Sequence, residues 1–289
     1  MAPILRLAFG GFDGAMVNKE TVFQATDVGY CYGDGIAALN GVTLSIQFGE
    51  KVAILGANGS GKSTFLKLLD GLYFATSGEL LAFGQPLTEK WLRAEQSVFA
   101  FRRRVGFVFQ DSDVQLFSPT VWDEVAFGPL QLGLTGTELA NRVDAILRFM
   151  QICHLKDRPP YRLSGGEKKK VALASVLVLK PRVLLLDEPT ANLDPRTQSS
   201  LVELLNELSL DGCTIVTATH DLDIVEVIAD RVYVIGEDHR LVAQGEPAEV
   251  LSRRDLLLAC NLIHEHTHKH QGDAHAHPHP HLSYHDHEH

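Results

Sequence analysis

A short stretch of the chain has the composition and spacing of a phosphate-binding loop. Residues 56–63 read Gly-Ala-Asn-Gly-Ser-Gly-Lys-Ser and match the pattern G-x-x-x-x-G-K-[ST]. The glycines let backbone N–H groups converge on phosphate oxygens, and a helix starting there adds the positive end of its dipole. We expect Lys62 to reach the β- and γ-phosphates of a nucleotide and the Ser63 hydroxyl to bind Mg²⁺. The predicted nucleotide-binding residues here are Gly56, Ala57, Asn58, Gly59, Ser60, Gly61, Lys62, Ser63 and Thr64.

Two adjacent carboxylates follow an apolar run later in the chain. Residues 183–186 are Val-Leu-Leu-Leu, and Asp187 and Glu188 come directly after them. A buried strand ending this way presents its acids at the carboxyl edge of a sheet, where ligands of open α/β sheets bind. We expect Asp187 to join the Mg²⁺ shell and Glu188 to act as the general base for an attacking water. With the loop at 56–63, this pair predicts nucleotide hydrolysis.

The elements that position these groups follow from the hydrophobic pattern. Residues 23–32 and 38–48 alternate apolar and polar side chains, which predicts strands of an antiparallel sheet. Beyond them, strands and helices alternate, which is typical of a parallel sheet wound on both faces. The predicted strands of that sheet are 50–55, 104–109, 183–187 and 214–218, and the predicted helices are 62–72, 165–179, 196–208 and 222–229. Residues 111–160 are rich in helix formers, include an amphipathic segment at 138–151, and end in Pro159 and Pro160.

Composition limits the classes of function. The chain has 289 residues and a formal net charge of −10, so a nucleic-acid binder with a basic surface is not expected. No apolar run approaches the roughly 18 residues needed to cross a bilayer, and residues 1–22 look like a short extension rather than a signal peptide. The four cysteines are far apart, which favours a reducing compartment.

The C-terminal stretch 264–289 holds eleven of the 14 histidines and has no aliphatic periodicity. We expect residues 261–289 to form a disordered tail. Imidazole is a good ligand for Ni²⁺, Co²⁺, Cu²⁺ and Zn²⁺. The hypothesis is a transition-metal buffer or sensor, and the alternative is a tail without function. The candidate ligands are His264, His266, His268, His270, His275, His277, His279 and His281.

A motif ahead of the predicted helix at 165–179 identifies a family. Residues 163–168 read Leu-Ser-Gly-Gly-Glu-Lys and resemble the L-S-G-G-Q signature of ATP-binding cassette (ABC) ATPases, with Glu167 in place of the usual Gln. The resemblance implies that Ser164, Gly165 and Gly166 serve the ATP held by an opposite subunit, so that two cassettes bury two nucleotides. The implied fold is a P-loop NTPase. It combines a parallel-sheet core, an antiparallel β subdomain and a helical subdomain at about 111–163, within a cassette at 23–260.

Other positions match the family in the expected order. Gln110 resembles the glutamine that touches Mg²⁺ and senses a membrane partner, and residues 191–194 resemble the D-loop, with Asp194 at the dimer interface. His220 resembles the switch histidine that contacts the γ-phosphate, and Tyr32 resembles the aromatic that stacks on adenine. Ala57 departs from the proline usual in relatives. The implied catalytic residues are Glu188, His220, Lys62 and Gln110, and the implied Mg²⁺ ligands are Ser63, Gln110 and Asp187.

Residues 111–133 indicate one subgroup within this family. They begin Asp-Ser-Asp-Val-Gln-Leu-Phe and resemble the pattern of energy-coupling factor ATPases, with the cobalt and nickel uptake group called CbiO or NikO as the nearest match. The resemblance implies a homodimer or a heterodimer with a second cassette, a transmembrane coupling subunit and a membrane substrate-binding subunit. It also implies a peripheral location on the cytoplasmic face of the cell membrane. The alternatives are vitamin uptake by the same motor, a soluble ABC ATPase outside transport, and a metal-storage protein.

Overall fold

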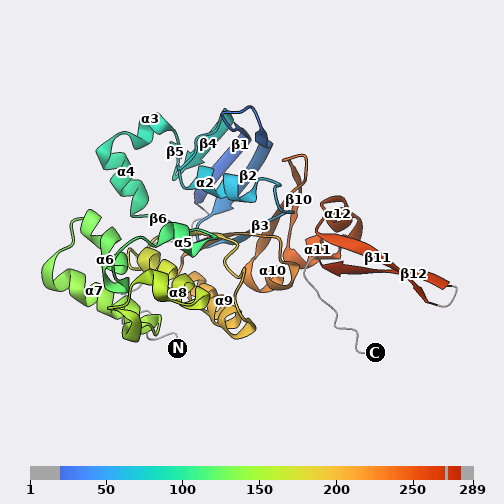
Figure 1. Cartoon of the computed structure of the whole chain (residues 1–289). Helices are drawn as coiled ribbons and strands as arrows, with labels where there is room; N and C mark the ends of the chain where they lie inside the picture. Colours follow the sequence, from blue (N-terminus) through green and yellow to red (C-terminus); the bar gives the residue numbers. More distant parts are fainter. Residues whose placement is uncertain (1–19, 271–272, 281–289) are drawn as a thin grey trace.

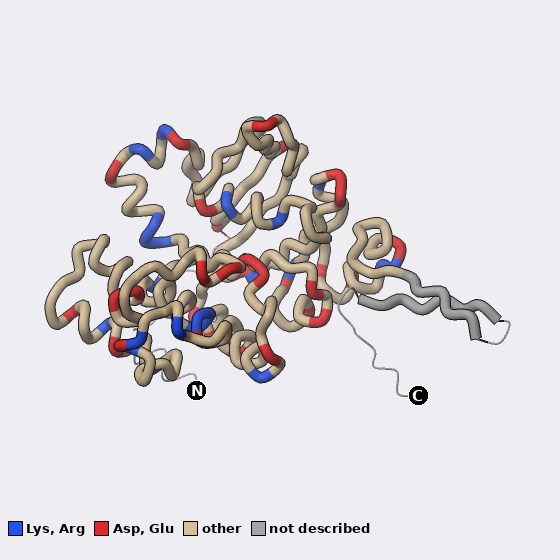
Figure 2. Tube along the Cα trace, viewed as in Figure 1, with Lys and Arg blue, Asp and Glu red and all other residues tan. Residues whose placement is uncertain are grey.

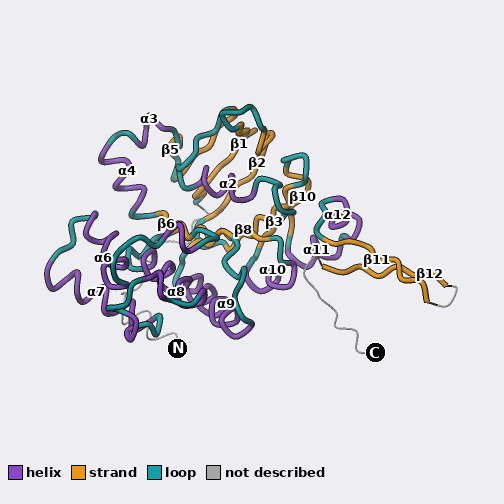
Figure 3. The backbone as a smooth tube through the Cα atoms, in the orientation of Figure 1, coloured by secondary structure: helices purple, strands orange, loops and turns teal. Residues whose placement is uncertain are grey.

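The computed structural model describes residues 20–270 and 273–280. Its centre is a six-stranded sheet with the order β10-β9-β3-β8-β7-β6 (Figures 1 and 3). The pairs β6–β7, β7–β8, β8–β3 and β3–β9 are parallel, and β10 pairs antiparallel with β9. The bounds are β3 (Lys51–Leu55), β6 (Val105–Val108), β7 (Val183–Asp187), β8 (Thr214–Thr219), β9 (Arg231–Ile235) and β10 (Leu241–Gly245). The predicted parallel sheet is confirmed.

The strand β7, which lies between β8 and β6, shows why the sheet needs cover on both faces. All five of its residues are buried. Val183 and Leu185 belong to a core shared with α2 (Lys62–Leu69) and the antiparallel strands. Leu184 and Leu186 belong to a second core that includes residues of the helical region 121–177. Alternate side chains of a strand point to opposite faces, so a continuous apolar run fits a strand buried on both sides.

A second, four-stranded antiparallel sheet has the order β2-β1-β4-β5. Its strands are β1 (Thr21–Cys31), β2 (Ala37–Gln47), β4 (Ser77–Ala82) and β5 (Gln85–Pro86). The two strands predicted from alternation at 23–32 and 38–48 are β1 and β2, and they pair antiparallel. β1 begins at Thr21, two residues before the predicted start of the cassette, and residues 1–19 lie outside the described part of the chain.

The predicted helices are present, but several of them begin or end at residues other than those predicted. α2 ends at Leu69 rather than 72 because Asp70 caps it and Gly71 has a φ of +68°. α8 (Gly165–Leu177) ends two residues early, ahead of Lys180 with a φ of +54°. α9 (Pro195–Leu210) and α10 (Leu222–Ile228) complete this set. The helical region contains α5 (Ser112–Gln115), α6 (Val121–Gln131), α7 (Gly136–Phe149) and the 3₁₀ turns η1 (Cys153–Leu155) and η2 (Pro160–Arg162).

Several elements were not predicted. Residues 73–103 carry β4, β5, α3 (Glu89–Leu92) and α4 (Glu95–Arg102), and residues after 229 carry β9, β10, α11 (Pro247–Ser252) and α12 (Arg254–Ala259). Buried residues of β3 and β9 and of the helices α10 to α12 form a third apolar core, which includes Leu55, Val234 and Leu257. The C-terminal elements therefore complete the edge of the central sheet.

The histidine-rich stretch, predicted to be disordered, contains two strands. β11 (Ile263–His270) pairs antiparallel with β12 (Asp273–Pro280), and the hairpin extends beyond α12 in Figure 1. Histidines recur at every second position, and this period of two is the period of a strand. The period is carried by histidines and not by apolar residues, so apolar periodicity does not reveal these strands.

The surface of the described part is mixed in charge. Lys and Arg positions and Asp and Glu positions are both spread over the chain trace in Figure 2. Within the described residues, no helix combines the length and apolar character needed to span a membrane.

Candidate active site

Four neighbouring parallel strands bring the predicted motifs to one edge of the central sheet. The loop 56–61 follows β3, Glu188 follows β7, His220 follows β8, and Gln110 lies just beyond β6. The register pairs Leu55 with Thr219 and Asp187 with Ala218, so these carboxyl ends are level. The structure therefore brings together residues that lie far apart in the sequence.

The loop between β3 and α2 has the backbone that its glycines require. Gly61 has a φ of +109°, and a Cβ there would lie 2.2 Å from the carbonyl oxygen of Ala38. A Cβ at Gly56 would lie 2.6 Å from the carbonyl oxygen of Ile235. Neither position can take a side chain without moving the neighbouring backbone. The loop is thus held against β2 and β9 while its N–H groups lead into the first turn of α2, the geometry of a phosphate site.

Lys62 is buried inside this loop. Its Nζ atom donates to the carbonyl oxygens of Gly56 at 2.8 Å and Ala57 at 3.1 Å, and lies 3.5 Å from Oε1 of Glu188. Burial lowers the pKa of the Lys62 ammonium, and the Glu188 carboxylate opposes that shift. The Lys62 ammonium and the Glu188 carboxylate are therefore buried side by side.

Ser63 and Asp187 meet at the same place. The Ser63 hydroxyl donates to Oδ1 of Asp187 at 2.8 Å. Burial raises the pKa of Asp187, while the Ser63 hydrogen bond lowers it and Glu188 raises it further. A hydroxyl and a carboxylate at this separation are hard oxygen ligands of the kind Mg²⁺ binds. A divalent cation would also relieve the burial of the Asp187 charge, so these two residues fit the ion.

Glu188 is the buried centre of the site. Its Oε1 atom lies 2.8 Å from Nδ1 of His220, and its Oε2 accepts from the Thr219 hydroxyl at 3.3 Å. The backbone of Glu188 has a φ of +42°, which is uncommon for a residue with a side chain. Its N–H donates to the carbonyl of Ala218, so the turn is fixed by the neighbouring strand. The carboxylate is thus held between an imidazole and an ammonium.

Tyr32 lies beside the first turn of α2. Its hydroxyl is 2.7 Å from Oγ1 of Thr64, and its ring contacts Tyr30 and Tyr73 edge-on at centroid distances of 5.2 and 6.0 Å. The ring is half-buried. Its position next to the phosphate loop is compatible with contact to a nucleotide base, and the stacking role stays a prediction.

Gln110 has an exposed side chain, and its main chain is fixed. Its carbonyl oxygen accepts from Nζ of Lys169, a residue of α8 that is only 4% exposed. Burial lowers the pKa of Lys169 to about 8, against the opposing charges of Asp187, Asp111 and Glu188. Lys169 was not among the predicted site residues. It lies in a run of three lysines, and nothing in that run marks the middle one as buried.

The signature residues and Asp194 stand at the starts of two helices. Ser164 caps α8, and a reciprocal capping box joins it to Glu167. The capping donors of Ser164 lower the pKa of the Glu167 carboxyl. Asp194 caps α9 by accepting from the N–H groups of Arg196 and Thr197. Within the described residues no hydrogen bond joins these caps to residues 56–63, and Ser164, Gly165 and Asp194 are exposed.

Other residues at the site were missed as well. Thr219 supports Glu188, and His239, in the turn between β9 and β10, places its Nδ1 atom 3.1 Å from the carbonyl oxygen of Ser60. Single polar residues carry no spacing signal, so only the fold identifies them. Of the predicted tail ligands, His281 lies outside the described residues, and for positions 266–279 only backbone is described. Elsewhere in the described chain no group of three or more His, Cys, Asp or Glu residues could hold a metal ion.

Comparisons with known proteins place this geometry among relatives. The family described as ABC transporter matches residues 39–191. A protein of Methanosarcina acetivorans, named for an ABC transporter ATP-binding role, is 53% identical over 272 residues, which are 93% of this chain and 99% of that protein. The nickel import ATP-binding protein NikO of Rhodobacter capsulatus is 50% identical over 244 residues, which are 83% of this chain and 95% of NikO.

Solved structures agree with the sequence relatives. The structure of CbiO1 from Clostridium perfringens, described as part of the ABC transporter complex CbiONQ, matches with a TM-score of 0.71 and 41% identity over 84% of this chain and 95% of that one. The ATP-binding cassette MJ0796, a dimer in a post-hydrolysis state bound to ADP and Pi, matches with a TM-score of 0.70 and 28% identity over 78% of this chain and 98% of that one.

Proposed function

Because the chain belongs to the ABC transporter family of ATP-binding cassettes, we propose that it hydrolyses ATP to power uptake of cobalt or nickel ions through an energy-coupling factor membrane complex. The observation that carries the hydrolytic part is the position of Glu188. Its carboxylate lies 2.8 Å from His220 and 3.5 Å from Lys62, beside the paired Ser63 and Asp187.

The loop 56–61 and Lys62 would bind the triphosphate. The backbone N–H groups of residues 56–63 and the Lys62 ammonium supply positive charge where phosphate oxygens would lie. Ser63 and Asp187 would hold Mg²⁺, which neutralises charge on the phosphates when bound. Gln110, at the end of the neighbouring strand β6, is proposed as a further contact to the ion or to its water.

Hydrolysis is assigned to Glu188 and His220. A carboxylate fixed by a turn and by two neighbouring side chains is placed to take a proton from an attacking water. His220 orients that carboxylate through its Nδ1 atom and, as the switch histidine, would contact the γ-phosphate. Most of the catalytic effect is expected from positioning and electrostatics, as in phosphoryl transfer generally.

The complete site is proposed to need a second cassette. Ser164, Gly165 and Asp194 are exposed, so their surface is accessible to the nucleotide of an opposite subunit. The dimeric MJ0796 cassette with ADP and Pi supports this arrangement. A homodimer is the simplest form, and a heterodimer with a second cassette fits the same surfaces.

The membrane partners are proposed from the relatives and from one exposed surface. Val114, Phe117 and Phe127 are large apolar side chains that are 72%, 67% and 43% exposed, and the Phe117 and Phe127 rings contact each other. This surface directly follows Gln110 and would receive a transmembrane coupling subunit. A separate membrane subunit would bind the substrate, and the cassette would lie on the cytoplasmic face of the membrane.

Cobalt or nickel is favoured over a vitamin by the likeness to NikO, a nickel import protein, and to CbiO1. The test is uptake of radioactive Ni²⁺ or Co²⁺ by vesicles containing the cassette with its membrane subunits. ATP-dependent uptake that is lost in the Glu188→Gln variant is the expected result. Uptake of a vitamin in place of either metal, or a cassette that purifies with ribosomes or DNA and no membrane protein, would contradict the proposal.

The tail is proposed to bind the same class of metal. The hairpin register makes His264, His266 and His268 the direct cross-strand partners of His279, His277 and His275. Directly opposite residues of an antiparallel pair are close, and alternate residues share a face, so the backbone register places these histidine positions opposite one another on the two strands. Ni²⁺, Co²⁺ and Zn²⁺ all accept imidazole ligands, and the affinity order alone does not select one of them.

A matched pair of variants tests the tail by calorimetric titration with Ni²⁺. Replacing His275, His277 and His279 by Ala removes three paired positions, whereas replacing His285, His287 and His289 by Ala removes three histidines outside the hairpin. The first variant is expected to lose tight sites and the second to keep them. Equal losses would contradict pairing by register. Equal Ni²⁺ binding by the full chain and a chain ending at Leu262 would remove the tail as a metal site.

A further inference from the structure

The stretch that follows β6 is fastened to α8 by buried and charged side chains. Nζ of Lys169 donates to the carbonyl oxygens of both Phe109 and Gln110, at 3.1 and 3.3 Å. Lys169 is almost completely buried, so these carbonyls replace the water that an ammonium would otherwise need. The two consecutive peptide groups whose carbonyls belong to Phe109 and Gln110 are therefore tied to a residue in the second turn of the helix that begins at the signature.

Gln115 makes a second bridge between the same segments. Its Oε1 atom accepts from the N–H of Phe109 at 3.1 Å, and its Nε2 donates to the carbonyl of Ala172 at 3.0 Å. A third tie is the ion pair of Lys168 with Asp113, at 2.5 Å. The N–H of Phe109 is thus bonded to Gln115, which also bonds to α8, and the carbonyl of Phe109 is bonded to Lys169, which is a residue of α8.

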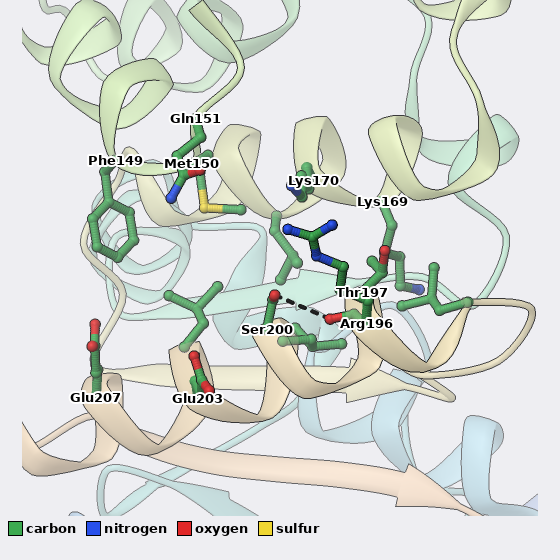
Figure 4. Close-up of a pocket in the computed structure, with 14 residues that line it drawn as sticks. Phe149, Met150, Gln151, Lys169, Lys170, Arg196, Thr197, Ser200, Glu203 and Glu207 are labelled. Carbon is green, nitrogen blue, oxygen red and sulfur yellow. Dashed lines mark hydrogen bonds between the residues drawn. The ribbon is translucent and has the colours of Figure 1, made fainter. Parts of the chain in front are cut away.

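α8 also borders a cavity on the side that faces α9. A cavity of about 350 Å³ lies between α8 and α9, where it is lined by Lys169 and Lys170 of α8 and by Arg196 and Glu203 of α9, and Figure 4 shows Arg196 extending from α9 toward α8. A void removes dispersion contacts from its lining. α8 is therefore held by polar bonds toward the segment 109–115 and has open space toward part of α9.

We propose that Lys169 and Gln115 are positioning residues that make Gln110 and the signature end of α8 move as one unit. The inference rests on the proposed part of Gln110 in ATP hydrolysis. Gln110 serves the nucleotide of its own chain, and Ser164, at the start of α8, serves the nucleotide of the partner. A displacement at either position is carried to the other because the two are joined by buried hydrogen bonds rather than by a flexible loop.

Two residues of the exposed apolar surface, Val114 and Phe117, lie in the segment that is tied to α8. Val114 and Phe117 flank Gln115, so a membrane partner seated there pushes on the same segment that Lys169 and Gln115 tie to α8. Force from the partner then reaches both ATP sites of a dimer in one step. The Asp-x-Asp-x-Gln pattern at 111–115 follows from this geometry: Asp111 caps α5, Asp113 pairs with Lys168, and Gln115 bridges to Ala172.

The test compares Lys169→Met and Gln115→Met with the control Lys170→Met in the full chain. Met keeps length and helix propensity and removes the polar bonds. We expect the first two variants to lower kcat about tenfold or more. The dissociation constant for a fluorescent ATP analogue in EDTA should stay within about twofold, because the phosphate loop is unchanged. Hydrogen exchange of residues 109–116 should accelerate in both variants. The control Lys170→Met should change neither kcat nor the rate of hydrogen exchange.

The outcomes separate this inference from the proposed function. Faster exchange with unchanged kcat would overturn it, because the ties would exist without positioning Gln110. Unchanged exchange in both variants would overturn it as well. A wild-type chain without ATPase activity would contradict the proposed function, while the exchange data would still report whether the segment is tied to α8. If Lys169→Met does not fold, Lys169→Gln, which keeps one donor group, is expected to fold with intermediate kcat, and Gln115→Met carries the test alone.

Discussion

The Nδ1 atom of His220 lies 2.8 Å from Oε1 of Glu188, although 32 residues separate the two in the chain. Parallel pairing of β7 with β8 brings them together, because Asp187 and Ala218 are register partners and both strands end there. The Glu188 side chain is almost fully buried, and that of His220 is 21% exposed. The carboxylate therefore has one imidazole neighbour at the open side of the site.

His220→Ala should reduce the ATPase rate without removing ATP binding. The variant deletes the group that orients Glu188, so we expect kcat to fall by about 10²-fold, the size typical of losing one preorganised polar group at a reacting centre. The dissociation constant for ATP should change little. Steady-state phosphate release and nucleotide titration measure the two quantities. The exposed His154 supplies a control, and a His220→Ala rate equal to that of His154→Ala would contradict the role.

Asp187→Asn should raise the Mg²⁺ concentration needed for half-maximal ATPase activity. The substitution removes a buried negative charge and keeps the shape of the side chain, so the oxygen pair with Ser63 loses most of its attraction for a divalent cation. The phosphate loop should still bind ATP in EDTA. A Mg²⁺ titration of the variant that superimposes on the wild type would show that Asp187 does not hold the ion.

Asp70 should make stability depend on pH in an unusual direction. Asp70 is the C-cap residue of α2 through its backbone N–H, and its buried carboxyl accepts from Arg102 at 2.7 Å. Burial nevertheless raises the pKa of this carboxyl to about 6, with Arg102 opposing the shift. The folded state therefore binds a proton more readily than the unfolded chain, so the wild type loses stability as pH rises from about 4 to 6.5. Asp70→Asn cannot ionise, and its free energy of unfolding relative to wild type should rise over that range by up to about 3 kcal/mol.

Chemical denaturation at several pH values between 4 and 7 measures this difference. The main-chain bond from Arg102 to the carbonyl of Asp70 is present in both proteins and does not contribute. A difference that stays constant with pH, or that falls as pH rises, would mean that Asp70 is ionised in the fold without cost.

Ser164→Arg should act on the partner's nucleotide rather than on its own. Ser164 is exposed and stands at the start of α8, whereas the phosphate loop precedes α2. The variant should therefore bind ATP normally as a monomer but fail to form the ATP-dependent dimer. Mixing it with Lys62→Ala should restore part of the activity, because one dimer then contains one complete composite site. Mixed subunits with no more activity than either variant alone would argue against sites shared between subunits.

The central sheet and the phosphate site were predictable because their signals are local. Four apolar residues before Asp187 fix a buried strand, and glycines before Lys62 fix a loop that starts a helix. Where a strand alternates, as in β1, the period of two was enough. Most of the predicted catalytic residues come together because each stands directly after such a strand.

The missed features depend on contacts that no local pattern encodes. Lys169 stands between two other lysines, and only the packing of α8 against the segment after β6 buries its ammonium. Residues 73–103 have no clear apolar period, so β4 and α4 could not be placed. The tail has a period of two carried by histidines instead of apolar residues, and such a pattern does not by itself predict the hairpin.

The most direct test of the account is single-turnover and steady-state ATP hydrolysis by Glu188→Gln beside the wild type. The amide keeps the contacts of the side chain but cannot accept a proton from water. Turnover should therefore fall by about 10²-fold or more, with ATP affinity retained and an ATP-bound dimer accumulating in gel filtration. A Glu188→Gln cassette that hydrolyses ATP at the wild-type rate would contradict the claim that Glu188, held by His220 and Lys62, is the base of this site.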